Sequence, residues 1–271
     1  RRRFLMSGFI FNVICTGQRF VNFSRGRCGC SFELRLRPVG QPIRYWPGQY
    51  VTLGNPRADI AARAYSISNA PRPDGELVLQ VARAEGGVTS NWVHDTLTIG
   101  DSVKISGAYG TFIGDPSVDT PVLCIAAGTG LAPVLALAEA ALRRGFRKPV
   151  TMLFSARSRE DIYSLGMMAW WRTKHRNFDY KVTLTRETAE GYLSGRIDVA
   201  LPQLFKDLSK HTIFIAGSPA FVDAAAAAAK ALGPGALGPV RVLVNSAGIL
   251  QKPLAPIILF VQKKKMLLKK T

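Results

Sequence analysis

The stretch that most constrains the fold of this chain is Pro121–Pro133, with the sequence PVLCIAAGTGLAP. Its residues 122–127 are small or apolar without polar alternation, which is typical of a strand buried on both faces of a parallel sheet. A Gly-Thr-Gly turn follows, and the alanine-rich segment 131–143 is predicted to be a helix. The backbone N–H groups at the start of that helix would face whatever lies beyond the strand, which makes the turn a candidate phosphate site. A purely structural glycine turn is the alternative.

The 271 residues are enough for two domains of ordinary size, and the sequence pattern changes at about residue 114. From 30 to 113, short alternating runs are broken by turn residues, which predicts a small antiparallel β-barrel. Strands are expected there at 31–39, 48–53, 63–68, 77–84 and 102–106.

From 118 to 248 the pattern becomes strand, helix, strand, which predicts a doubly wound parallel sheet. Strands are expected at about 122–127, 150–156, 180–185, 212–216 and 240–245, and helices at about 131–144, 160–175, 197–209 and 219–232. The segment Gly114-Asp115-Pro116-Ser117 is the expected linker between the two domains.

The net charge of +18 is concentrated at the two ends of the chain. Residues 1–44 carry nine Lys or Arg and one acid, and residues 241–271 carry seven Lys or Arg and no acid. The segment between them therefore has a net charge of only +3. This distribution argues against a nucleic-acid-binding protein.

Both ends are expected to lie outside the two domains. Residues 1–29 begin with three arginines and an apolar run, like the first parts of a signal peptide, but no clear cleavage site follows. A membrane-surface anchor or a fragment boundary is the alternative. Residues 249–271 form a basic tail that would suit an anionic membrane surface, although a disordered or non-native tail is the preferred interpretation. No run reaches the roughly 18 apolar residues of a membrane span.

The four cysteines, at positions 15, 28, 30 and 124, indicate a reducing compartment and hence a cytoplasmic protein. Cys28-Gly29-Cys30 has one residue between its thiols, which fits neither a zinc knuckle nor a plant-type iron–sulfur cluster. We therefore expect no metal site in this chain.

Four motifs follow one another in an order that resembles the ferredoxin–NADP reductase superfamily. They are Arg63-Ala64-Tyr65-Ser66, Val81-Ala82-Arg83 with Gly86-Gly87-Val88-Thr89-Ser90, Gly128-Thr129-Gly130-Leu131-Ala132-Pro133, and Ala216-Gly217-Ser218-Pro219. The resemblance covers roughly residues 35–244 and points to the FAD/NAD(P)H reductase components of bacterial aromatic-ring dioxygenases and multicomponent monooxygenases. It implies an antiparallel β-barrel FAD-binding domain followed by an α/β doubly wound NAD(P)-binding domain.

The resemblance assigns FAD to the first two motifs. Arg63 would neutralise the flavin pyrophosphate, and Tyr65 would lay its ring against the isoalloxazine. The hydroxyl of Ser66, the expected catalytic residue, would hydrogen-bond flavin N5, which accepts the hydride. A glycine-led turn with N–H groups and two hydroxyls suits the diphosphate. The other expected FAD-binding positions are Ala64, Val81, Arg83, Gly87, Val88, Thr89 and Ser90. An ordinary barrel strand and a simple loop are the alternatives.

NAD(P)H is assigned to the last two motifs and to the end of the second parallel strand. The expected positions are Gly128, Thr129, Gly130, Pro133, Ser155, Arg157, Gly217, Ser218 and Pro219. Ser155 and Arg157 would hold a 2′-phosphate, which favours NADPH, but NADH-using relatives also carry an arginine here and a solvated basic turn is the alternative. The choice between NADH and NADPH stays open.

Two positions depart from the family pattern. Ala216 stands where the family commonly has a reactive cysteine, and residues 244–248 lack the acid and the aromatic residue that usually cover the flavin. Arg27-Cys28-Gly29-Cys30 is similar to part of a ferredoxin cluster motif, but the remaining ligands are absent, so no iron–sulfur cluster is expected.

The resemblance implies a flavoprotein reductase that transfers hydride from NAD(P)H to FAD, and then single electrons to a separate ferredoxin or oxygenase component. A flavin- and nucleotide-binding regulatory subunit or sensor without steady turnover is one alternative. A folded but inactive remnant is another.

Overall fold

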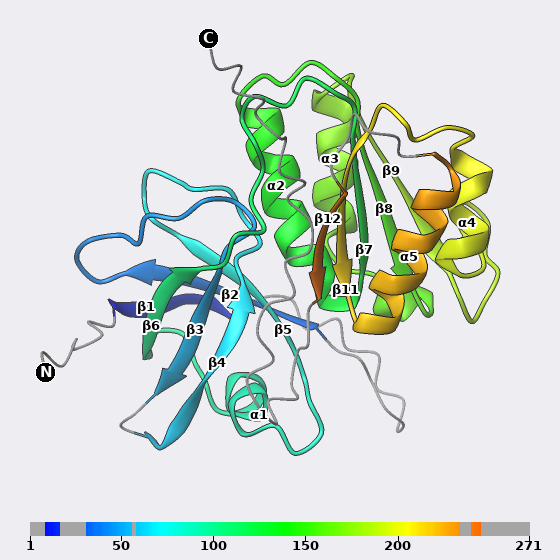
Figure 1. The fold of residues 1–271 in the computed structure, drawn as a ribbon. Helices are drawn as coiled ribbons and strands as arrows, with labels where there is room; N and C mark the ends of the chain where they lie inside the picture. Colours follow the sequence, from blue (N-terminus) through cyan, green and yellow to red (C-terminus); the bar gives the residue numbers. More distant parts are fainter. Residues whose placement is uncertain (1–8, 17–30, 56–57, 234–239, 245–271) are drawn as a thin grey trace, which may run out of the picture.

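The computed structural model describes residues 9–16, 31–55, 58–233 and 240–244. Within these ranges an antiparallel sheet with one helix forms the N-terminal domain, and a parallel sheet with helices on both faces forms the C-terminal domain (Figure 1). This confirms the predicted two-domain fold. The predicted basic tail, the Cys28-Gly29-Cys30 segment and most of the predicted N-terminal extension lie outside the described residues.

Six strands make the N-terminal sheet, in the order β4-β3-β6-β1-β2-β5. They are β1 (Phe9–Thr16), β2 (Ser31–Pro38), β3 (Tyr50–Asn55), β4 (Ile60–Ser66), β5 (Leu77–Ala82) and β6 (Ser102–Tyr109). An antiparallel bridge between Ile67 and Leu79 joins the end of β4 to β5 and closes the sheet into a barrel. Alternate residues fill its interior, and Leu34, Val51, Leu79 and Ile105 are fully buried there.

Strand β1 differs from the expected N-terminal extension over residues 1–29. Phe9–Thr16 lies between β6 and β2, with Phe9 opposite Ile105 and Phe11 opposite Pro38. An apolar run of this length has the same composition in a signal peptide and in a strand, and only the presence of two partner strands decides between them.

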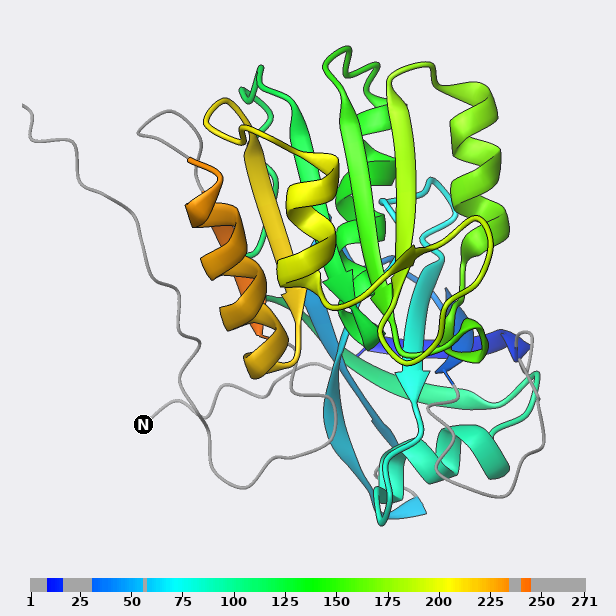
Figure 2. The same ribbon diagram turned by 90° about the vertical axis from the view of Figure 1, so that its right-hand side faces the viewer.

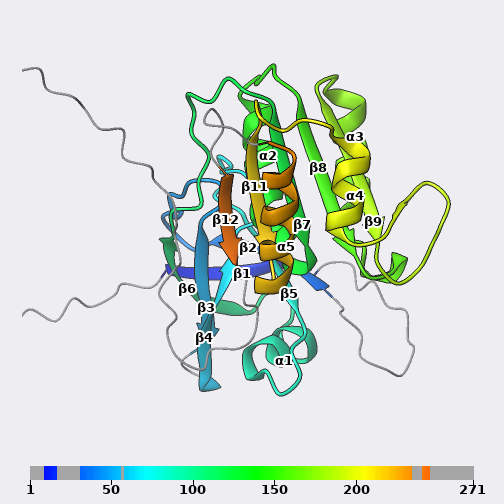
Figure 3. The same ribbon diagram turned by 45° about the vertical axis from the view of Figure 1, so that its right-hand side comes forward.

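The C-terminal sheet has the strand order β10-β9-β8-β7-β11-β12. Its strands are β7 (Val122–Ala127), β8 (Val150–Ala156), β9 (Phe178–Leu184), β10 (Leu193–Ser194), β11 (Thr212–Gly217) and β12 (Val240–Val244). All are parallel. Strands β8, β9 and β10 are added in turn on one side of β7, and the chain then returns to place β11 and β12 on the other side. The reversal of strand order falls between β7 and β11, where such sheets bind ligands. Figures 1 and 3 show the carboxyl ends of these strands toward the N-terminal domain.

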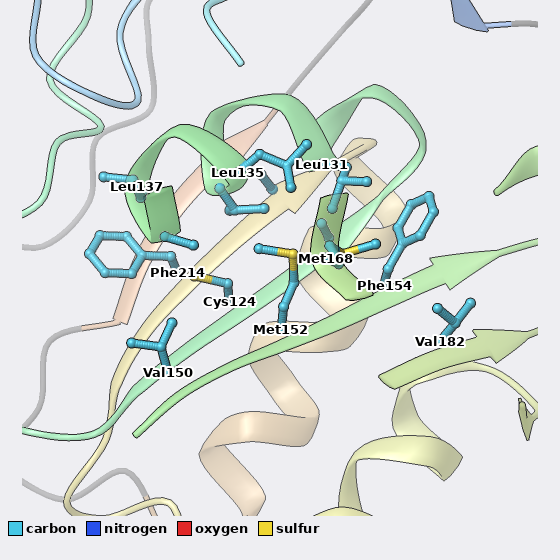
Figure 4. Close-up of a cluster of buried hydrophobic side chains, with 14 of the residues drawn as sticks. Cys124, Leu131, Leu135, Leu137, Val150, Met152, Phe154, Met168, Val182 and Phe214 are labelled. Atoms are coloured by element: carbon cyan, nitrogen blue, oxygen red, sulfur yellow. The ribbon is translucent and has the colours of Figure 1, made fainter. Parts of the chain in front are cut away.

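Helices cover both faces of this sheet (Figure 2). They are α2 (Leu131–Arg143) and α3 (Leu165–Lys174) on one face, and α4 (Ile197–Leu204) and α5 (Pro219–Ala231) on the other. On β7, Cys124 packs toward α2 and α3 (Figure 4), while Leu123 and Ile125 pack toward α4 and α5. The unbroken apolar run therefore serves two cores, as its lack of polar alternation predicts.

Two predicted helices are shorter in the structure. The helix expected over 160–175 becomes a turn of 3-10 helix, η3 (Arg159–Asp161), followed by α3, because Ser164 has a left-handed φ of 57° that interrupts the helix. The helix expected over 197–209 ends at Leu204, where Phe205 turns extended.

The two domains share an aromatic contact at the expected linker. Phe112 follows β6, and its ring packs edge-on against Phe214 of β11 at 5.7 Å, within the core of the C-terminal domain. Gly48 of the barrel lies so close that a Cβ there would be 2.0 Å from the Phe112 carbonyl oxygen. The end of the barrel is therefore tied directly to the parallel sheet.

Candidate cofactor site

The Arg63–Ser66 motif lies on β4, which pairs with β3 along its length. Alternation along the strand places Arg63 and Tyr65 on one face and Ser66 on the other. Arg63 is exposed, and in the described part of the chain its guanidinium has no carboxylate partner, donating only to the Ala62 carbonyl oxygen at 3.3 Å. Tyr65 is half-buried against the barrel core, and this burial raises its pKa to about 12, so the ring stays neutral at physiological pH.

The second motif forms the start of helix α1 (Val88–Asp95), which the sequence analysis did not predict. The Thr89 hydroxyl donates to the Ala61 carbonyl oxygen at 2.7 Å, and this bond holds the helix start beside β4. The first amide bonded within the helix is that of Asn91, to Gly87 O at 2.9 Å. The N–H groups before it have no partner within the helix, and the first turn carries no acid. The Thr89–Ala61 bond thus brings the start of α1 to the strand that carries Arg63, whose guanidinium has no carboxylate partner within the described ranges.

Several side chains that were expected to bind FAD instead contact other groups of the protein. The Ser90 hydroxyl accepts the Ala84 N–H at 3.1 Å and donates to Gly87 O at 3.0 Å, which closes the glycine turn. Val81 is fully buried in the barrel core. Arg83 forms a bidentate ion pair with Asp95, one of whose N–O distances is 2.8 Å. These side chains hold α1 in place, so the groups of the motif that would be left to bind a ligand are its backbone N–H groups.

The Gly128–Gly130 turn, η2, ends β7 and starts α2. Gly128 has a φ of +53°, and a Cβ on Gly130 would be 2.3 Å from the Ala216 carbonyl oxygen. Gly130 is therefore required by the close approach of β11, whereas Gly128 is required by the left-handed turn. The Tyr163 hydroxyl donates to the Gly128 carbonyl oxygen at 2.8 Å, a contact that the sequence analysis missed. Pro133 is buried in the first turn of α2, where a missing N–H costs nothing.

The Gly217-Ser218-Pro219 turn lies at the neighbouring strand end. Ser218 is exposed and is the N-cap of α5, and its hydroxyl makes no capping bond. Pro219 begins the helix. The N-termini of α2 and α5 both follow adjacent strands at the point where strand order reverses, and neither first turn contains an acid. The structure therefore brings two positive helix ends together. Ala216, at the position of the missing cysteine, is fully buried.

An acid lies beside Arg157, at the end of β8. Asp161 accepts hydrogen bonds from Arg157 Nε at 3.2 Å and Nη2 at 3.1 Å, and from the Ser158 hydroxyl at 3.3 Å. An NAD-specific site commonly has an acid at this strand end to hold the ribose 2′-hydroxyl, and Asp161 was not among the residues predicted from the sequence. Ser155, the other predicted residue here, is buried.

In residues 9–16, 31–55, 58–233 and 240–244, no three His, Cys, Asp or Glu side chains come together as a metal ion would require. Among the helices of these same segments, none has the length and hydropathy of a membrane span.

Two family models match the chain, one for each domain. An oxidoreductase FAD-binding domain matches residues 29–113, and an oxidoreductase NAD-binding domain matches residues 124–227. Fold and motifs together therefore define an FAD- and NAD-binding oxidoreductase.

Relatives narrow this class. The ferredoxin–NAD(P)(+) reductase component of naphthalene 1,2-dioxygenase/salicylate 5-hydroxylase systems from Ralstonia is 32% identical over 193 residues, which are 71% of this chain and 58% of the relative. The reductase subunit of an Amycolatopsis aromatic O-demethylase is 33% identical over 72% of this chain and 59% of its own length. The crystal structure of an Amycolatopsis cytochrome P450 reductase superposes with a TM-score of 0.76 at 28% identity, covering 86% of this chain and 69% of that one.

This chain belongs to the ferredoxin–NADP reductase superfamily, as its motif order indicates. It spans less than two thirds of the length of the two curated relatives above.

Proposed function

We propose that this chain is the FAD- and NAD(P)H-binding part of a reductase that takes electrons from a nicotinamide nucleotide and passes them singly to a separate protein acceptor. The observation that carries the proposal is the arrangement of charge. Arg63, which has no carboxylate partner among the described residues, lies on β4, and a bond from Thr89 to Ala61 holds the start of α1 against the same strand. The acid-free starts of α2 and α5 lie at the carboxyl ends of the parallel strands, which face the same domain. Each of these is suited to a pyrophosphate, and the family binds two dinucleotides.

The described residues fit FAD. Arg63 and the first N–H groups of α1 would bind its pyrophosphate, and the neutral ring of Tyr65 offers an apolar surface to a flavin. The Ser66 hydroxyl is half-buried and has no hydrogen-bond partner among the described residues, so it remains available to a flavin nitrogen. The chemistry that bound FAD supplies is two-electron acceptance from a nicotinamide and one-electron release. The task of the protein is to orient the two rings, for which no acid or base is needed.

A purified, FAD-loaded protein tests the proposal by anaerobic stopped-flow mixing with NADH and NADPH, followed at 450 nm. We expect rapid bleaching, and then catalytic reduction of a one-electron dye. Failure to bind FAD would contradict the proposal. Binding of both cofactors without bleaching would favour the regulatory alternative. The cytoplasmic location expected from the cysteines stays a prediction.

The two arginines expected at the FAD site give the first matched test. An Arg63→Ala variant should bind FAD about 10- to 100-fold more weakly, because it loses a charge-assisted hydrogen bond to a phosphate. An Arg83→Ala variant should stay within about threefold of wild type, because an exposed ion pair such as that with Asp95 is worth only about 0–1 kcal/mol. Flavin fluorescence titration measures both affinities. An equal loss in the two variants would refute the assignment of the pyrophosphate to Arg63.

We further propose that NADH is the preferred nucleotide. The Asp161 carboxylate neutralises Arg157, and it would repel the 2′-phosphate of NADPH. An Asp161→Asn variant should therefore raise the ratio of kcat/KM for NADPH to that for NADH about fivefold, as expected for about 1 kcal/mol from one partly exposed charge. Glu160→Gln is the control, because it removes the same charge from an exposed neighbour that makes no ion pair with Arg157 in the described residues. Equal ratios in the two variants would count against this choice.

A further inference from the structure

A buried carboxylate joins the two domains. Glu139 lies on α2 and is only 7% exposed, and its Oε2 accepts the backbone N–H of Ala70, in the N-terminal domain, at 2.6 Å. Its Oε1 lies 2.8 Å from the Arg143 guanidinium on the same helix and 3.8 Å from that of Arg72, which belongs to the other domain. The carboxylate is thus fully compensated, and its partners come from both sides of the interface.

On the barrel side, this contact leads directly to the proposed flavin site. Ala70 follows Ser66 by four residues, and the intervening residues 67–69 are all buried. The Ser68 N–H donates to Val78 O at 2.8 Å, and the Asn69 side chain accepts the Val78 N–H at 2.8 Å. The segment from Ser66 to Ala70 is therefore held rigidly against β5, and Ala70 at its end is the residue that Glu139 contacts.

On the other side, the contact leads to the proposed nucleotide site. Glu139 and Gly130 belong to one continuous helical segment, with η2 running straight into α2. A helix of this length is a stiff rod of about 13 Å between the two residues. Figure 1 shows α2 as one continuous helix. A shift of Glu139 relative to the barrel would therefore also shift the Gly128–Gly130 turn relative to the barrel.

We propose that Glu139 is a positioning residue that sets the distance between the dinucleotide turn and Ser66, and through it the approach of the nicotinamide to the flavin. The inference rests on the proposed function. Domains joined by an ordinary interface are expected to move relative to each other. Hydride transfer requires ring atoms about 3–3.5 Å apart, and a misplacement of about 1 Å costs about 100-fold in rate. Loss of the Glu139–Ala70 hydrogen bond is therefore expected to reduce the rate of hydride transfer strongly, while the affinities for FAD and for the nucleotide change little.

The test compares Glu139→Leu, which removes the acceptor at similar size, with Glu139→Gln, whose amide oxygen still accepts the Ala70 N–H. In the FAD-loaded full chain, Glu139→Leu should slow the limiting rate of flavin reduction by at least about tenfold, with FAD affinity and nucleotide Kd within about threefold of wild type. Glu139→Gln should restore most of the rate. The deuterium isotope effect with NADH labelled at the transferred position should rise in Glu139→Leu, because the chemical step becomes slower.

Glu76→Leu is the matched control, because Glu76 is another buried glutamate that pairs with Arg72 but lies wholly within the N-terminal domain. It should lower the melting temperature without changing the limiting rate. If Glu139→Leu does not fold, Ala70→Pro removes the donor instead, at a position whose following residue is already a proline. A wild-type reduction rate in Glu139→Leu, or in Ala70→Pro if Glu139→Leu does not fold, would overturn the inference. A wild-type protein that neither nucleotide reduces would instead overturn the proposed function itself.

Discussion

A Gly130→Ala variant is expected to lose reduction by the nicotinamide nucleotide and to melt about 5–10 °C lower than wild type. The added Cβ would lie 2.3 Å from the Ala216 carbonyl oxygen, 2.4 Å from its carbon and 2.6 Å from the Gly217 nitrogen. All three are backbone atoms of β11, in the middle of the sheet, so no side-chain rotation can relieve the clash. The separation of β7 and β11 would have to increase where the two helix N-termini meet.

Two other glycine-to-alanine variants serve as controls, because they test the effects of backbone conformation and helix propensity without this steric clash. Gly128→Ala meets nothing within 4 Å but must adopt a φ of +53°, so it should cost about 1–2 kcal/mol without moving β11. Gly166→Ala lies in a helix in open space and should be neutral or slightly stabilising. Thermal unfolding followed by circular dichroism, together with the rate of bleaching by NADH, measures all three. A Gly130→Ala protein as stable as Gly166→Ala would contradict the packing argument.

A Ser66→Ala variant should bind FAD within about threefold of wild type but slow its reduction by NADH about 10- to 100-fold. The hydroxyl would stabilise the charge that develops at the flavin nitrogen, and hydrogen bonds to charged groups are worth about 1.5–3 kcal/mol. This hydroxyl is half-buried at the end of β4, opposite Tyr50, and makes no hydrogen bond to any residue in the described part of the chain. Single-turnover bleaching at 450 nm gives the rate without contribution from the acceptor.

Ser68 provides the control two residues further along. Its hydroxyl is buried and donates to the Val78 carbonyl oxygen at 2.9 Å, so Ser68→Ala should lower the unfolding free energy by about 1 kcal/mol and leave the bleaching rate unchanged. If both variants reduced flavin at the same rate, the proposed role of Ser66 would be wrong.

The parallel sheet was the most predictable part of the fold. Its central strands β7, β8 and β11 are largely apolar, and each lies within one residue of its expected bounds. Strands buried on both faces are recognised by continuous apolar runs, and half-buried barrel strands by alternating apolar and polar residues. The short strand β10 and helix α1 carry no such pattern, and they form because neighbouring elements offer them hydrogen bonds and apolar cover.

The functional side chains were harder to predict than the fold. The motifs indicate candidate segments, but the side chains of Thr89, Ser90 and Arg83 bond to protein partners in the structure. Tyr163 and Glu139 belong to no motif, because their contacts form only with residues that another element brings within hydrogen-bonding distance.

The order of motifs and the apolar runs alone determined the superfamily, the two domains and the class of cofactors, because these depend on local pattern along the chain. Only the tertiary structure decided which strand fills the middle of the barrel, which acid faces Arg157, and how α2 is joined to the segment after Ser66. The first and the last of these features join residues 96 and 69 positions apart, and they are fixed by packing that no single stretch of sequence contains.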